Sequence, residues 1–308
     1  MDTRHLAAFT AVVDTGSFTR AAAVLHCSQP TVTSRIKALE QSLGTALFER
    51  LPSEVRLTPA GQTLVRYARD IMSLTLDAQS AISSNGAMSG RIDVGTVESV
   101  TSYRLLPVVE YLYRRYPSIS LSMRASACGE TISLVRQGKL HCAFFVDLPG
   151  DRPELEVRAL CPEPLVLVGG AGHLLVGRAN VTDDEVRSAT LVRAESGANY
   201  HDQFERFLGL DIAQDRPRVL ELDSIDVTKR SVAVGLGIAL IPAIAVVDEL
   251  AAGELCRIDW VPPFEVFTQV AWRRGTRSNA LLSALLDGAE QVISEQLREL
   301  DEADAKSG

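Results

Sequence analysis

A short polar segment near the N-terminus carries side chains whose chemistry suits contact with DNA bases. Ser28 is a suitable helix N-cap, and Pro30 fits the first turn of a helix, where a missing N–H costs little. Gln29 can form two hydrogen bonds to adenine, and the methyl groups of Thr31 and Thr33 can contact thymine. These residue types are typical of a helix that enters the major groove by its N-terminal end.

The pattern that follows predicts which face of this helix is buried. Apolar residues recur at offsets of four, three and four and form one stripe, which consists of Val32, Ile36, Leu39 and Leu43. The outward-facing residues at helical spacing are Pro30, Ser34, Lys37 and Gln41. Arg35 lies nearer the buried stripe, so a phosphate contact suits it better than a base contact.

Two more helices and a hairpin are predicted around this segment. The first helix covers about residues 5–15, and Ser17 has the chemistry of an N-cap for the second. Two short helices joined by a few residues form a helix-turn-helix. Residues 46–58 then predict a two-stranded hairpin, a wing, with Arg50 and Arg56 near its base. On these patterns alone, a packed helical hairpin with no role in DNA binding remains an alternative.

The distribution of charge is compatible with DNA binding, although the chain has a net charge of −8. Residues 1–60 hold six basic and five acidic side chains, so this part carries +1 and the remainder −9. A local basic patch matters more for phosphate binding than the total charge. The first residues do not resemble a signal peptide, and no apolar run is long enough to span a bilayer. We expect a cytoplasmic protein with at least two domains and no membrane association.

These motifs resemble a known family. Residues 17–61, with the run SFTRAAAVLHCSQPTVTSRIKALEQSLGTALFERLPSEVRLTPAG, strongly resemble the N-terminal domain of LysR-type transcriptional regulators. The resemblance implies that the helix enters the groove and that the wing contacts the DNA backbone. The residues that we predict to contact promoter DNA are Ser17, Thr19, Arg20, Ser28, Gln29, Pro30, Thr31, Thr33, Ser34, Arg35, Lys37, Arg50 and Arg56. Many family members carry a basic residue where this chain has Ser34.

A long helix is predicted after the wing, from Pro59 to about Ser83. Its heptad-like seam consists of Leu64, Ala68, Ile71, Thr75, Ala78 and Ile82. Such a seam favours pairing with a second chain, and packing on its own domain is the alternative. The resemblance also implies a dimerising linker helix and a tetramer of two dimers. We therefore divide the chain into a DNA-binding domain at residues 1–58, a linker at 59–89 and an effector domain at 90–308.

The last part of the chain alternates between strands and helices. We predict strands at residues 92–96, 119–124, 142–146, 164–168, 190–193 and 219–222 and helices at residues 103–116 and 131–137. This alternation predicts parallel sheets with helices on both faces. The runs YLYRRYPSISLSM and VAVGLGIALIPAIAV resemble the family's effector domain, which has two α/β subdomains similar to periplasmic binding proteins.

The predicted fold class is thus α + α/β, with a discontinuous first subdomain. Subdomain I covers about residues 90–162 and 268–308, and subdomain II covers about residues 163–267. The chain is expected to cross between them near Pro162 and Phe267.

In such sheets, ligands bind beyond the carboxyl ends of the strands, where helices begin. The residues predicted at these places are Val97, Glu98, Ser99, Thr101, Ser102, Cys128, Asn199, Tyr200 and Ser224, with residues 196–198 beside them. Each polar residue is equally well explained as a helix cap. Helix N-termini favour anions, so we predict a small carboxylate-bearing effector. Glu98 argues for an additional amino group on the effector, unless its side chain points to solvent.

Other classes of function have little support in the sequence. Five widely spaced cysteines form neither a disulfide framework nor a zinc site, and we expect no metal and no cofactor. Gly235 and Gly237 lack the third glycine of a dinucleotide fingerprint, and no catalytic signature stands out, so we do not expect an enzyme. The rival mechanism is a thiol redox sensor that uses Cys128, with Cys142 on a nearby strand. Contact with RNA polymerase is left open.

Overall fold

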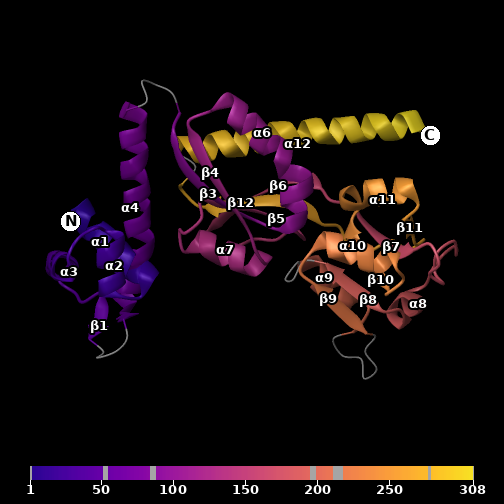
Figure 1. The fold of residues 1–308 in the computed structure, drawn as a ribbon, viewed down its shortest axis with the longest axis horizontal. Coiled ribbons are helices and arrows are strands. Elements are labelled where there is room, and N and C mark those ends of the chain that lie inside the picture. Colours follow the sequence, from indigo (N-terminus) through magenta and orange to yellow (C-terminus); the bar gives the residue numbers. More distant parts are fainter. Residues whose placement is uncertain are drawn as a thin grey trace. The chain divides into compact units, whose positions relative to one another are not determined.

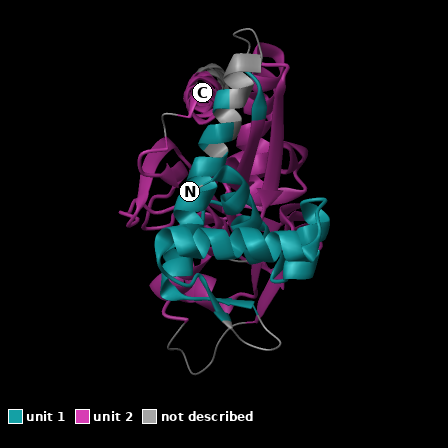
Figure 2. Cartoon of the chain, turned by 90° about the vertical axis from the view of Figure 1, so that its left-hand side faces the viewer, with its two compact units in different colours: residues 1–90, 137–139 teal, residues 91–136, 140–308 magenta. Residues whose placement is uncertain are grey.

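The chain folds into two compact units. The computed structural model describes residues 2–50, 55–83, 88–194, 199–210, 218–276 and 279–307. One unit consists of Met1–Gly90 with Gln137–Lys139, and the other consists of Arg91–Arg136 with Leu140–Gly308 (Figure 2).

The first unit begins with three helices, as predicted. They are α1 (Thr3–Thr15), α2 (Phe18–Val24) and α3 (Gln29–Leu43). The hydroxyl of Ser17 accepts a hydrogen bond from the N–H of Arg20, and Ser28 accepts one from the N–H of Thr31. Both predicted N-caps are therefore confirmed. Gly16 and Gly44 end α1 and α3 in the left-handed conformation, which costs a glycine little.

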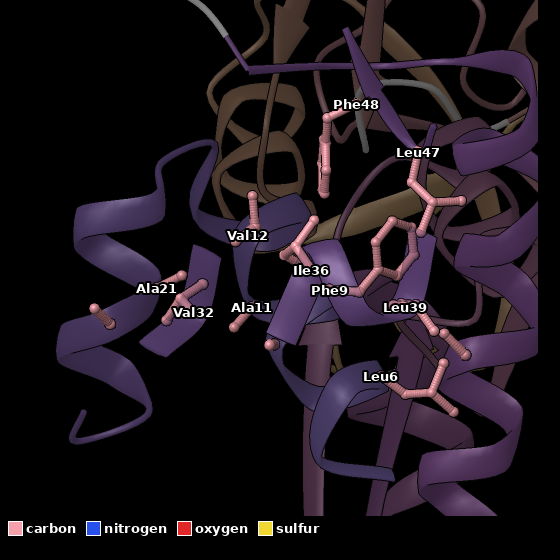
Figure 3. Packing of buried hydrophobic residues seen from close by; sticks show 13 residues of the cluster. Leu6, Phe9, Ala11, Val12, Ala21, Val32, Ile36, Leu39, Leu47 and Phe48 are labelled. Atoms are coloured by element: carbon pink, nitrogen blue, oxygen red, sulfur yellow. The ribbon is translucent and has the colours of Figure 1, made fainter. Parts of the chain in front are cut away.

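The apolar faces of these helices meet in one core (Figure 3). Val32, Ile36 and Leu39 of the predicted stripe are buried, whereas Leu43 at its end is exposed. The wing closes this core, because the ring of Phe48 lies 5.4 Å from the ring of Phe9. The predicted hairpin is confirmed.

The wing pairs β1 (Phe48–Arg50) antiparallel with β2 (Val55–Leu57). Residues 51–54 and the side chain of Arg50 lie outside the described residues. Thr58 follows the wing, and its hydroxyl donates a hydrogen bond of 2.7 Å to the carbonyl oxygen of Ala46.

The linker helix α4 (Pro59–Ser83) has the predicted extent, but the first half of its predicted seam packs against its own unit rather than against a second chain. Ala68 is fully buried in the core of its own unit, and Leu64 and Ile71 pack against that core. The first half of the predicted seam therefore packs within the chain, as the alternative proposed. Tyr67 and Leu74, seven residues apart, are 51% and 56% exposed on the same helix. The side chain of Ile82 lies outside the described residues.

The second unit contains two five-stranded sheets, which confirms the predicted two-subdomain α/β fold (Figure 1). The first sheet has the order β4-β3-β5-β12-β6. Its strands are β3 (Gly90–Thr96), β4 (Ile119–Ala125), β5 (Cys142–Asp147), β6 (Leu155–Pro162) and β12 (Phe267–Arg273). The helices α6 (Leu106–Arg115) and α12 (Ala280–Ser307) lie side by side, and α7 (Cys128–Arg136) packs on β5 and β12.

The second sheet has the order β11-β7-β10-β8-β9. Its strands are β7 (Leu165–Gly170), β8 (Leu191–Ala194), β9 (Val219–Leu222), β10 (Ile238–Pro242) and β11 (Leu255–Arg257). The helical segments of this subdomain are α8 (Asp183–Ser188), α9 (Asn199–Phe207), α10 (Ile225–Ala233), η2 (Ala243–Val246) and α11 (Val247–Ala252). The chain thus leaves the first sheet after Pro162 and re-enters it at Phe267.

Both sheets are mixed, so the prediction of parallel sheets was wrong in part. β12 runs antiparallel to β5 and β6, and β7 runs antiparallel to β10 and β11. These are the strands that follow each crossing. Phe267 at the start of β12 pairs with Asp147 at the end of β5, and Leu165 pairs in the same way with Pro242. A strand that enters at the carboxyl end of its neighbour must run in the opposite direction.

The predicted helix at residues 103–116 also has a different beginning. A single turn, α5 (Glu98–Val100), is followed by a π-helical turn, η1 (Thr101–Leu105), before α6 begins. Ser99 therefore lies inside the first turn rather than ahead of a helix, and that prediction was wrong. The predicted strands at residues 92–96, 142–146 and 219–222 are confirmed within two residues.

Candidate functional site

The first turns of α3 present a polar surface. Gln29, Pro30, Ser34 and Lys37 are exposed. The backbone carbonyl of Gln29 accepts a hydrogen bond of 3.1 Å from the Thr33 hydroxyl, so Thr33 also supports its own helix. This surface can donate hydrogen bonds to base edges and accept hydrogen bonds from them, and the cation Lys37 lies farther along the helix.

The remaining predicted DNA contacts surround this helix. Thr19, Arg20 and Arg56 are exposed, whereas Ser17 and Arg35 are half-buried. Ser28 and Thr31 share a hydrogen bond of 2.8 Å between their hydroxyls, so both side chains also serve the cap of α3. Arg50 cannot be placed, because its side chain lies outside the described residues.

The second candidate site lies where the two sheets of the second unit meet. Here Glu98 reaches from subdomain I to the start of α10. The hydroxyl of Ser224 donates a hydrogen bond of 3.1 Å to Glu98 Oε1, and the N–H of Ile225 donates one of 3.0 Å to Oε2. Ser224 is the N-cap of α10, yet its side chain makes no capping hydrogen bond within its own helix. The alternative that Glu98 points to solvent is therefore wrong.

The neighbours of Glu98 in the sequence are placed differently from one another. Val97 and Ser99 are buried, and Ser102 is exposed. The Thr101 hydroxyl donates a hydrogen bond of 2.9 Å to the carbonyl oxygen of Val97, so it supports its own turn. The structure thus brings Glu98 and Ser224 together and leaves Ser102 at the surface.

A second contact between the subdomains centres on Asp147, which sequence reasoning missed. The amide of Asn199 donates a hydrogen bond of 2.6 Å to Asp147 Oδ2 and lies 3.8 Å from Cys128 Sγ. Arg152 pairs with the same carboxylate, and the N–H of Leu148 donates to its other oxygen. Asp147 directly follows the predicted strand at residues 142–146, so the rule that identified Glu98 would also have identified it.

A third contact joins Tyr103 to Lys229. The ammonium of Lys229 donates a hydrogen bond of 3.1 Å to the Tyr103 hydroxyl and pairs with Glu249 at 2.6 Å. Burial alone would lower the pKa of Lys229, but its hydrogen bonds to Glu249 and Tyr103 raise that pKa above its ordinary value. Neither Tyr103 nor Lys229 has a sequence motif that would have identified it.

A buried ion pair lies at the crossing between the sheets. Arg104 donates to both carboxylate oxygens of Glu163 at 2.9 Å, and both side chains are 2% exposed. The Thr268 hydroxyl also donates to Glu163, at 2.7 Å. Burial would lower the pKa of Arg104, but the hydrogen bonds and charge of Glu163 hold it above its ordinary value.

The other predicted residues of this region contribute less. Tyr200 is fully buried, and its ring lies 4.3 Å from the ring of His201, so packing explains its position. Residues 196–198 lie outside the described residues. Within the described part of the chain, no three histidine, cysteine or acidic side chains are grouped to hold a metal ion.

Comparison with known proteins identifies the two units. The family model for the bacterial regulatory helix-turn-helix protein of the lysR family matches residues 3–62. The family model for the LysR substrate binding domain matches residues 85–293. The chain belongs to the LysR family. Its members are transcriptional regulators that bind DNA and small-molecule effectors, and they are not enzymes.

The similarity to individual LysR-family proteins covers nearly the full length of the chain. The uncharacterized HTH-type transcriptional regulator YwqM of Bacillus subtilis (strain 168) is 32% identical, over 93% of this chain and 98% of its own. A hydrogen peroxide-inducible genes activator of Dickeya chrysanthemi is 27% identical, over 97% and 98%. The crystal structure of ArgP from Mycobacterium tuberculosis has the same fold, with a TM-score of 0.74, 22% identity and coverage of 96% and 98%.

The two glycines considered for dinucleotide binding have a structural role in this LysR-family fold. Gly235 follows α10 with a φ of +85°, and a Cβ on Gly237 would lie 2.3 Å from the carbonyl oxygen of Thr190. Close backbone packing therefore requires glycine at position 237. In the described part of the chain, no helix is both long enough and apolar enough to cross a membrane.

We predict that peroxide or iodoacetamide modifies Cys128 more slowly than half-buried Cys27 at pH 7. Burial, and then the charge of Asp147, raise the pKa of Cys128 to about 12, so the reactive thiolate is scarce below that pH. The rate of Cys128 modification should start low and rise about tenfold with each pH unit, without a plateau between pH 7 and 9, because the thiolate fraction rises in this way below the pKa. Mass spectrometry of proteolytic peptides measures each cysteine separately. Rapid modification of Cys128 at pH 7 would contradict this assignment.

Proposed function

We propose that this LysR-family regulator reads double-stranded promoter DNA with the first turns of α3. The observation that carries the proposal is the exposure of Gln29, Pro30, Ser34 and Lys37 on a helix whose opposite face is buried from Val32 to Leu39. Buried Val32 and Ile36 fix the rotation of the helix, so the polar face has one orientation with respect to its unit. A DNA-binding regulator acts where the chromosome is, and we therefore place it in the cytoplasm.

Gln29→Ala should relax the preference for one base pair in each half-site, at a cost of about 1–3 kcal/mol for the preferred sequence. Lys37→Ala is the matched control, because a phosphate contact carries no sequence information. It should weaken binding to all sequences and reduce the salt dependence by about one ion. Competition binding with a randomised operator library at two salt concentrations measures both effects. An unchanged specificity ratio for Gln29→Ala would place the recognition surface elsewhere.

Self-association is the second part of the proposed function. Tyr67 and Leu74 form an exposed apolar stripe on α4, at the seven-residue spacing of a helix pair. We infer that α4 pairs with α4 of a second copy through this stripe, in a homodimer or a tetramer of two dimers. Half-sites on promoter DNA then follow the symmetry of the protein. Such an assembly at a promoter would also be within reach of RNA polymerase.

Leu74→Glu should dissociate the dimer while each chain remains folded, because a carboxylate is costly in an apolar interface. Ile71→Glu is the contrasting variant, since Ile71 packs against the core of its own unit, and it should lower the melting temperature. Sedimentation velocity at micromolar concentration and thermal unfolding separate the two effects. A wild-type chain that sediments as a monomer, or a Leu74→Glu variant that remains dimeric, would refute the pairing.

The third part concerns the effector. We propose a small metabolite with a carboxylate, bound between the two subdomains near Glu98, Ser99, Cys128, Asn199 and Ser224. Support comes from α10, whose first N–H and N-cap hydroxyl already bind a carboxylate, that of Glu98. Helix N-termini stabilise anions through their unpaired N–H groups and dipole.

A metabolite-library thermal-shift screen on the full chain tests this part, because a ligand that binds only the folded state raises the melting temperature. We expect hits to carry a carboxylate and to bind Ser224→Ala at least about tenfold more weakly by calorimetry. DNA binding in the absence of the hit should be unchanged in that variant. If Ser99→Ala and Ser224→Ala both bind the hit as tightly as wild type, the effector site lies elsewhere.

Redox sensing is the second candidate function. One relative, the activator of Dickeya chrysanthemi, is named for hydrogen peroxide, which favours it. In this chain all five cysteines are free thiols, and burial raises the pKa of Cys128, Cys142 and Cys161. Protonated thiols react slowly with peroxide. The chemistry of this chain therefore favours a metabolite over an oxidant as its signal.

A further inference from the structure

One short segment of subdomain I makes contacts in three directions. We call residues 98–105 the latch segment; it consists of α5 and the π-helical turn η1. Glu98 binds the start of α10, Tyr103 binds Lys229 in the next turn of α10, and Arg104 binds Glu163 at the crossing. The same few residues thus contact subdomain II at two points and the strand connection between the subdomains at a third.

The π-helical turn explains how consecutive residues reach different partners. An i→i+5 turn holds one residue more than an α-helical turn, so it shifts the face on which Tyr103 and Arg104 lie relative to Glu98. Tyr103 is half-buried and faces α10, whereas Arg104 is buried and faces Glu163. Isolated π-turns are uncommon and occur frequently at functional sites.

The start of α10 binds the carboxylate of Glu98 in the way that a helix N-terminus binds an anionic ligand. Its two oxygens are bound separately, by the Ser224 hydroxyl at 3.1 Å and by the Ile225 N–H at 3.0 Å. Ser224 directs its hydroxyl to Glu98 instead of capping its own helix. Glu98 follows β3 of the first sheet and Ser224 follows β9 of the second sheet, so this carboxylate comes from the other subdomain.

On the side of subdomain II, α10 is firmly held. Ile225 and Val232 are buried in the core of that subdomain. Lys229 is anchored by Glu249 and by the carbonyl oxygen of Ala245, at 2.6 Å and 3.1 Å. Because α10 is packed in this way, a displacement of its first turn also displaces the rest of subdomain II.

We propose that the latch segment holds the two subdomains together through Glu98, which acts as an internal ligand of α10, and that an effector carboxylate binds by taking its place. The proposal rests on the carboxylate effector inferred above and adds the group that it displaces. Release of Glu98 breaks the first of the two contacts with α10, while Arg104 keeps the segment anchored at the crossing. Effector binding thereby removes one of the contacts that hold subdomain I to subdomain II.

Chemical rescue with acetate tests the latch on the full chain without DNA and without an identified effector. Glu98→Ala should lower the melting temperature by roughly 2–6 °C. Sodium acetate should restore part of that loss in a saturable manner, and sodium chloride at equal ionic strength should not. The apparent affinity of Glu98→Ala for acetate should exceed that of wild type at least about tenfold. Glu98→Ala/Ser224→Ala should lose the response, and Glu221→Ala, which removes an exposed acid, should behave as wild type.

A double-mutant cycle provides the second measurement, also where Glu98→Ala does not fold. Glu98→Gln and Tyr103→Phe each remove one polar interaction with little change in shape. If the latch segment acts as one unit, their losses in melting temperature should not add, and the double variant should lose less than the sum. Additive losses, or acetate stabilisation that is equal in wild type and Glu98→Ala, would overturn the proposal. Either result would leave DNA reading and effector sensing as proposed, because neither experiment involves DNA or the effector.

Discussion

The buried ion pair of Arg104 and Glu163 is the interaction on which the effector domain depends. Two charges that are 2% exposed are costly to bury, and removing one of them would leave the other uncompensated, at a cost of about 3–5 kcal/mol. Glu163 lies directly after β6, and the hydroxyl that completes its hydrogen bonds belongs to Thr268 in β12. The pair therefore ties the first helical turns of subdomain I to both strands at which the chain crosses between the sheets. The strand register also shifts between Thr268 and Gln269, as is common where a β-bulge redirects a side chain.

The other contacts between the subdomains are weaker than this ion pair and are broken more easily. They are the contacts of Asp147 with Asn199, of Glu98 with the start of α10 and of Tyr103 with Lys229, and each consists of one or two hydrogen bonds at the edges of the two sheets. Each is worth about 1–3 kcal/mol, comparable to the stabilisation of about 2.7 kcal/mol that a ligand supplies at a hundred times its Kd. A fixed crossing with adjustable contacts beside it suits a domain that reports on a metabolite. It also suits a LysR-family regulator, in which the signal must leave the effector domain.

Local signals in the sequence predicted the DNA-binding unit well. The caps Ser17 and Ser28, the glycines after α1 and α3 and the stripe from Val32 to Leu39 are all set by neighbours within one or two turns. The effector domain was predicted less well, because its features depend on residues far apart. Arg104 and Glu163 are 59 positions apart, and no local pattern indicates their pairing or the direction of β12. The packing partner of the α4 seam was misassigned, because a heptad seam has the same pattern whether its partner is another chain or its own domain.

We infer that a small molecule binds between the two subdomains and thereby controls a DNA-binding protein. Hydrogen exchange of the full chain, with and without a hit from the metabolite screen, tests it most directly. We expect slower exchange at residues 97–103 and at residues 223–229 together, since a ligand between the subdomains contacts both. Protection confined to one subdomain, or to the DNA-binding unit, would contradict it.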